Sequence, residues 1–124
     1  MLMSLILSTE LKNARLQVIC DAIDNGNSKL VVYDVAQDVI CELTFPNPCK
    51  ADISNAVLTF NNLTESMVLL SSTATNAKVI NDSDTVLFDL TIGNSDSAAD
   101  IKLPSTALYQ GSLLRLNGWT ISES

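Results

Sequence analysis

The chain of 124 residues contains no histidine. Histidine is the usual base that activates a serine or cysteine nucleophile, so Ser–His and Cys–His catalysis are excluded. No Ser-x-x-Lys sequence offers the lysine-activated alternative. The glycines are too far apart to form a phosphate-binding loop, since they are Gly26, Gly93, Gly111 and Gly118. We therefore expect a protein that is not an enzyme and that uses no cofactor.

Basic residues are also few, with 7 Lys and Arg against 14 Asp and Glu, which gives a net charge of -7. The basic residues are scattered and form no stripe that could follow a phosphate backbone, so we expect no nucleic-acid partner. The apolar start, residues 1–7, has no basic flank and is far too short to span a bilayer. We expect no membrane partner.

Cysteine is present in an odd number, as Cys20, Cys41 and Cys49, which argues against a complete disulfide framework. No Cys-x-x-Cys sequence occurs, so a zinc site is not expected. Free thiols that act as small buried apolar groups suit a protein assembled in a reducing cytoplasm.

Aspartate gathers between Lys78 and Lys102, where no basic residue interrupts it. Carboxylate and amide oxygens are the ligands that calcium prefers, although the spacing here matches no EF-hand loop. The alternatives are ordinary turn residues and a docking face for a basic partner. The candidate calcium ligands are Asn81, Asp82, Asp84, Asp96 and Asp100.

A helix is predicted at about residues 9–24. Ser8 can cap its first turn, Glu10 suits the positive end of its dipole, and Asn25-Gly26 supplies a left-handed residue that ends it. Apolar residues follow helical spacing and predict one buried stripe: Leu11, Ala14, Val18, Ile19, Ala22 and Ile23.

Short β segments follow the helix. In residues 39–45, Val39, Cys41, Leu43 and Phe45 alternate with Ile40, Glu42 and Thr44, which is typical of a half-buried strand. Asn and Asp between two apolar arms predict a hairpin at residues 77–92, and Asn117-Gly118 predicts a bulge in the last strand. Residues 71–76 and 93–99 are expected as loops. The predicted strands are residues 29–35, 39–45, 53–60, 66–70, 77–80, 85–92, 100–103 and 112–122.

The pattern as a whole predicts a mainly β fold: one antiparallel β-sandwich or jelly-roll-like domain with one N-terminal α-helix. This domain is expected to cover residues 8–124, with the sandwich at about 29–122. Residues 1–7 form either an edge strand beside the helix or an apolar arm that adds to a neighbour's sheet. The residues expected to contact a partner are Leu2, Leu5, Ile6, Leu7, Tyr109 and Trp119.

The order of these segments resembles a family of small proteins from tailed bacteriophages and prophages. The similarity rests on segments spread over nearly the whole chain: Asn13–Gln17, Ala22–Asp24, Lys29–Asp34, Glu42–Phe45, Ala77–Asp84, Val86–Gly93, Asp100–Leu103 and Trp119–Glu123. Members of this family are mostly regarded as uncharacterised or virion-associated, and no catalytic residues carry over. The chain departs from the family at Ser66–Leu70, where relatives are richer in Gly and Ala, so its partner surface is expected to differ.

The resemblance implies a bacteriophage structural protein, and the expected role is a capsid decoration or cement protein that stabilises the assembled head. The expected partners are the major capsid protein or other virion proteins, together with further copies of the chain, and the expected location is the virion. The alternatives are a neck, collar or tail component, and a host-surface glycan-binding module in which Trp119 stacks on a sugar.

Overall fold

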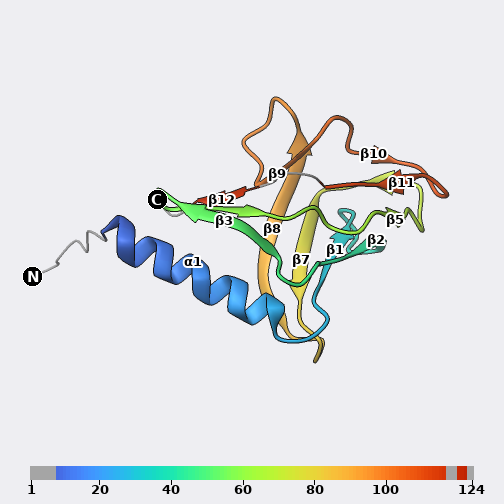
Figure 1. The fold of residues 1–124 in the computed structure, drawn as a ribbon. Coiled ribbons are helices and arrows are strands. Elements are labelled where there is room, and N and C mark those ends of the chain that lie inside the picture. Colours follow the sequence, from blue (N-terminus) through green and yellow to red (C-terminus); the bar gives the residue numbers. More distant parts are fainter. Residues whose placement is uncertain (1–7, 117–119, 123–124) are drawn as a thin grey trace, which may run out of the picture.

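The structure is a computed structural model that describes residues 8–116 and 120–122 (Figure 1). In chain order its elements are α1 (Thr9–Asp24), β1 (Lys29–Tyr33), β2 (Val39–Thr44), β3 (Lys50–Ser54), β4 (Val57–Phe60), β5 (Ser66–Met67), β6 (Ser72–Thr73), β7 (Asn76–Ile80), β8 (Val86–Asn94), β9 (Ile101–Leu103), β10 (Ala107–Leu108), β11 (Leu113–Leu114) and β12 (Thr120–Ser122). The predicted start and end of the helix are confirmed. The predicted bulge at residues 117–118 and the arm at residues 1–7 lie outside the described residues.

Helix α1 begins where Ser8 Oγ accepts a hydrogen bond of 3.1 Å from the N–H of Leu11. The predicted buried stripe is wrong for four of its six members, because Leu11, Ala14, Val18 and Ala22 are exposed. The face that packs on β3 and β4 instead buries Leu16, Cys20 and Ile23. In the part of the chain that the structure describes, no helix is long and apolar enough to cross a lipid bilayer.

The largest sheet has the strand order β2-β1-β7-β8-β9. Two bulges determine which side chains of β2 and β8 are buried. Ile40 is an extra residue in β2, so that it is buried and Val39 is exposed. Leu87 is the extra residue in β8, which leaves Val86 exposed. All ladders in the described residues are antiparallel except β8–β9, which is parallel with Ile92 opposite Ile101.

A second sheet has the order β12-β4-β3 and corrects the prediction of one strand over residues 53–60. The chain turns at Asn55 and Ala56, whose φ angles of 51° and 62° are left-handed, so that β3 and β4 form a hairpin. Other predicted bounds also change: β5 is shorter than residues 66–70, the segment 71–76 contains β6, β8 runs on to Asn94, and residues 112–122 contain two strands.

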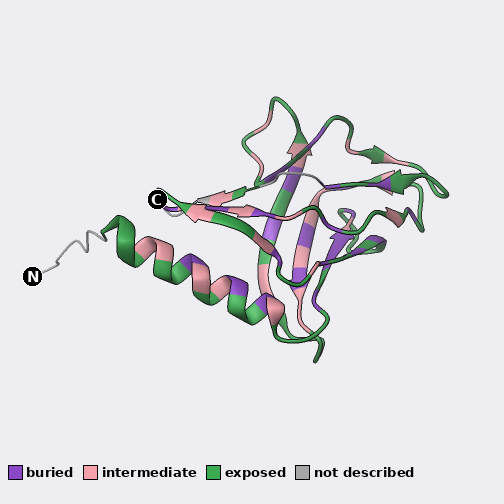
Figure 2. Ribbon diagram, in the orientation of Figure 1, coloured by how far each residue is buried: buried purple, intermediate pink, exposed green. Residues whose placement is uncertain are grey.

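The sheets curl around one apolar core, as expected for a sandwich-like, mainly β fold. Figure 2 shows the buried positions along β1, β7 and β8 and on one side of α1. Phe45 and Phe60 lie in this core with ring centroids 5.9 Å apart, and Phe88 packs partly against it. The largest fully buried side chains include Leu16, Leu30, Leu43, Leu58 and Ile101.

Gly26 should not tolerate a side chain. Its φ of 105° is rarely adopted by other residues, and an added Cβ would lie 2.7 Å from the Cβ of Asp82 in the β7–β8 turn. Gly26→Ala is therefore expected to lower the free energy of unfolding by about 1–3 kcal/mol from backbone strain, plus the cost of the clash. Urea denaturation measures this loss.

Gly111 provides the matched control for that substitution. Its φ of 91° is also left-handed, but an added Cβ would meet nothing within 4 Å. Gly111→Ala should therefore lose only the strain contribution. Equal losses for the two variants would contradict the close packing of Gly26 on Asp82.

Candidate protein-docking surface

Three segments of this acidic chain run for twelve residues without a charged residue: residues 53–64, residues 66–77 and residues 103–114. Among the described residues, the last two of these segments carry five exposed large apolar side chains, whereas residues 53–64 carry none. We call the part of the molecule formed by these last two segments, residues 66–77 and 103–114, the charge-free end. An uncharged region in a chain with a net charge of -7 is a region where another protein can approach without electrostatic repulsion.

The two segments form one antiparallel ribbon, residues 63–74 paired with residues 106–116. Met67 lies opposite Leu113 in β5–β11, and Ser72 lies opposite Leu108 in β6–β10. Between these ladders the N–H of Val68 donates to the carbonyl oxygen of Ser112 at 2.7 Å. The pairing brings together segments far apart in the sequence, at the side of the molecule opposite α1 (Figure 1).

The ribbon buries one set of side chains and exposes another. Val68 is 1% exposed and Leu114 7% exposed, so these residues hold the ribbon on the core. Met67, Tyr109 and Leu113 are 53%, 66% and 55% exposed. Leu69 and Leu70 also reach solvent. Single exposed apolar residues are common, whereas several gathered on neighbouring strands are typical of a protein–protein contact.

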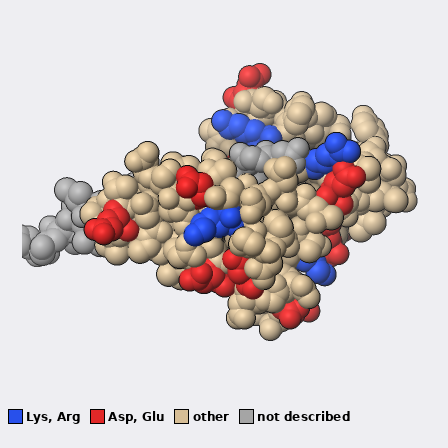
Figure 3. Space-filling model, viewed as in Figure 1, with Lys and Arg blue, Asp and Glu red and all other residues tan. Residues whose placement is uncertain are grey.

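Charged side chains border this region and do not enter it. Figure 3 shows the right-hand tip of the molecule without a charged side chain, while acidic and basic groups are spread over the rest of the visible face. Glu65 and Arg115, the residues that flank the uncharged segments, form an ion pair. An apolar centre with a charged border is the usual composition of a docking surface.

Asp34 connects the charge-free end to the β1–β2 turn. Its Oδ1 accepts hydrogen bonds from the N–H groups of Ala36 at 3.0 Å and Asp38 at 2.9 Å, and its Oδ2 accepts one of 3.0 Å from the hydroxyl of Ser72. The N–H of Asp38 is the main reason that the pKa of Asp34 lies below its ordinary value, and burial opposes that shift. The ionised carboxylate therefore stabilises this junction.

The protein should lose stability in acid through Asp34. A carboxyl whose pKa is lower in the folded state stabilises the fold above its unfolded pKa of about 4, and this contribution disappears as the pH falls through the folded pKa. Asp34→Asn cannot ionise, so it should be less stable than the wild type at pH 7 and lose less stability between about pH 4 and pH 2. Urea denaturation across that range tests this, and parallel losses would contradict it.

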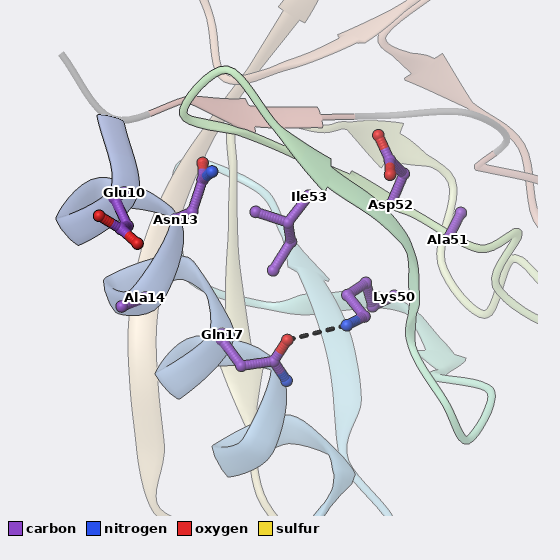
Figure 4. Close-up of a pocket in the computed structure, with 8 residues that line it drawn as sticks. All are labelled: Glu10, Asn13, Ala14, Gln17, Lys50, Ala51, Asp52 and Ile53. Atoms are coloured by element: carbon purple, nitrogen blue, oxygen red, sulfur yellow. Dashed lines mark hydrogen bonds between the residues drawn. The ribbon is translucent and has the colours of Figure 1, made fainter. Parts of the chain in front are cut away.

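A polar groove lies between α1 and β3 (Figure 4). Its volume is about 450 Å³, and its lining residues are Glu10, Asn13, Ala14, Gln17, Lys50, Ala51, Asp52 and Ile53. Lys50 Nζ donates to Gln17 Oε1 at 2.8 Å, and Asn13 Oδ1 accepts from the N–H of Ala56 at 2.9 Å. These bonds hold α1 against the β3–β4 hairpin, so the polar side chains here have a structural role.

The aspartates considered for calcium do not come together. Asp82 and Asp84 lie in the turn before β8, and Asp96 and Asp100 follow it. The nine residues of β8 span about 30 Å. Asp100 Oδ2 accepts hydrogen bonds from the backbone and hydroxyl of Thr91. Within residues 8–116 and 120–122, no three His, Cys, Asp or Glu residues are placed to share a metal ion.

The cysteines lie inside the core, and none of them forms a disulfide in the structure. Burial raises the pKa of the thiols of Cys20, Cys41 and Cys49 above its ordinary value. The thiol of Cys49 partly offsets the rise in the pKa of Cys20, whereas the thiol of Cys20 adds to the rise in the pKa of Cys49. Such thiols stay protonated at neutral pH and are poor nucleophiles.

Of the residues expected to contact a partner, the structure places Tyr109 in the charge-free end. Leu2, Leu5, Ile6, Leu7 and Trp119 lie outside the described residues. Sequence reasoning did not select the other exposed members of this end, which are Met67, Leu69, Leu70 and Leu113. The signal that could have found them is the absence of charge from the two segments that contain them.

Comparisons with known proteins identify no relative of this chain. No protein-family model, no curated protein and no solved structure matches the chain.

Proposed function

We propose that the protein is a non-enzymatic structural component of a tailed-bacteriophage virion, a decoration or cement protein that binds the assembled head. The observation that supports this role is the charge-free end, where apolar side chains on two paired strands face solvent. The proposal combines this surface with the resemblance of the sequence to small proteins of tailed bacteriophages. A protein of this kind acts through the surface that it presents and needs no reactive group.

Binding by many copies would stabilise the shell through mass action. A protein that binds the assembled state and not its separated subunits shifts the equilibrium toward assembly. The symmetry of the shell repeats each modest contact many times over. The acidic remainder of the surface keeps free copies soluble and directs contact to the uncharged region.

The test is binding to purified heads of the phage that encodes the chain, with two substitutions on the charge-free end. Met67→Asp/Tyr109→Asp, hereafter the surface variant, places two charges among the exposed apolar side chains. We expect the wild type to bind in proportion to the capsid subunits and the surface variant to bind at least about tenfold more weakly. Co-sedimentation with heads measures both quantities.

Val86→Asp is the matched control, because Val86 is also an exposed apolar residue but lies on β8, outside the charge-free end. Its affinity should equal that of the wild type. Absence of binding to heads would overturn the proposal. A copy number equal to one ring of subunits would instead indicate the neck, collar or tail.

A further inference from the structure

The charge-free end has a chemical counterpart in the first seven residues of the same chain. Residues 1–7 contain four Leu or Ile residues, two Met residues and no charged side chain. We propose that residues 1–7 of one copy dock on the charge-free end of a second copy. This inference rests on the proposed function in one respect, namely that the charge-free end is a protein-docking surface.

Charge favours this occupant over other parts of a second copy. Each molecule carries a net charge of -7, so contacts between most pairs of faces bring carboxylates together. Neither residues 1–7 nor the charge-free end contains a charged side chain, and both are rich in large apolar residues. Their contact removes apolar area from water without placing like charges side by side.

The position of α1 favours contact between two copies over contact within one. Helix α1 begins at the end of the molecule opposite β10 and β11 (Figure 1). Its 16 residues span about 24 Å. Seven residues reach at most about 25 Å when fully extended. Even fully extended, the segment before Ser8 is therefore only about as long as α1, and the charge-free end of its own molecule lies beyond α1. The charge-free end of a neighbouring copy can lie directly beside this segment.

Such a contact joins two different surfaces, so it is a head-to-tail contact. Each copy donates residues 1–7 and accepts the same segment from the next copy. Repetition of this contact closes a ring or continues as a chain, depending on the rotation between copies. On a shell, linked copies would hold neighbouring capsid subunits together, which is the action expected of a cement protein.

The experiment uses two variants that each remove one half of the contact. The deletion variant lacks residues 2–7, and the surface variant carries Met67→Asp/Tyr109→Asp. In sedimentation velocity the wild type should self-associate with rising concentration, and each variant alone should remain monomeric. An equal mixture should form a one-to-one complex, because the surface variant supplies residues 1–7 and the deletion variant supplies the charge-free end.

Two further variants control for folding and for charge. Leu5→Asp/Ile6→Asp keeps every residue and should behave as the deletion variant does. Val86→Asp should self-associate as the wild type does. Thermal unfolding of each variant shows whether a loss of association follows a loss of structure.

Three results would overturn the inference: a wild type that is monomeric at every concentration, a deletion variant that self-associates normally, or a mixture that forms no complex. Normal association of the deletion variant would indicate that two charge-free ends meet each other. If the deletion variant also binds heads, the proposed function survives the failure of this inference. A one-to-one complex without binding to heads would support this inference and overturn the proposed function.

Discussion

Leu16→Ala is expected to lower the free energy of unfolding by about 2–5 kcal/mol, and Leu11→Ala by less than about 1 kcal/mol. Leu16 is 0% exposed on the face of α1 that packs on β3 and β4, so its truncation leaves a cavity in the core. Leu11 is 48% exposed, so its truncation removes little buried area. Urea denaturation followed by circular dichroism measures both losses.

The two substitutions are matched in chemistry and in helix propensity, since both replace Leu by Ala within α1. The difference between them therefore reports burial alone. Equal losses would mean that Leu11 is buried too, as the sequence pattern predicts. A larger loss at Leu11 would mean that α1 is rotated relative to the structure.

The ends of α1 could be predicted from the sequence, because local signals determine them. The hydroxyl of Ser8 caps the first turn, and Gly26 adopts the left-handed conformation that ends the helix. The buried face could not be predicted in the same way. Leu11 and Val18 follow helical spacing as well as Leu16 and Cys20 do, so two apolar stripes compete. Packing on β3 and β4 decides between them.

In the strands too, local sequence patterns predict some features and tertiary contacts determine others. Alternating residues identify most of β2 and β8, but one extra residue in each, Ile40 and Leu87, changes which side chains are buried. The sequence does not predict the β3–β4 turn, because Ala56 is left-handed there and alanine is not a residue that signals a turn. The parallel pairing of β9 with β8 depends on tertiary contacts that local patterns do not encode.

The docking surface could be predicted only in part. Tyr109 is among the contact residues that the sequence predicts, and the structure exposes it. Met67 and Leu113 belong to segments far apart in the sequence, and only the β5–β11 ladder makes them neighbours. Pairing between strands this far apart in the sequence cannot be predicted from a single chain. The absence of charged residues from both segments can be seen directly in the sequence.

Val68→Asp is expected to destabilise the protein strongly. Val68 is 1% exposed, so a carboxyl at this position would be buried among apolar groups. Such burial raises the pKa of a carboxyl by about 3–5 units. The folded pKa then lies at or above neutral pH, so at pH 7 the cost is set by the roughly 3 units between pH 7 and the unfolded pKa of about 4. At about 1.4 kcal/mol per unit this is about 4 kcal/mol, a large part of the stability of a small domain. Met67→Asp, one residue away, should cost less than about 1 kcal/mol because Met67 is 53% exposed.

The pH dependence distinguishes a buried charge from a general packing defect. The carboxyl in Val68→Asp has a raised pKa in the folded state, so its penalty grows with pH between the unfolded and the folded pKa. It is therefore large at pH 7 and shrinks as the pH falls toward about 4. Urea denaturation at pH 7 and pH 5 should show the variant recovering stability relative to the wild type, while Met67→Asp changes little. Both substitutions should weaken docking, but for different reasons. Met67→Asp places a charge on the docking surface of an intact ribbon, whereas Val68→Asp detaches the ribbon from the core. Equal stability of the two variants would mean that Val68 does not hold the charge-free end in place.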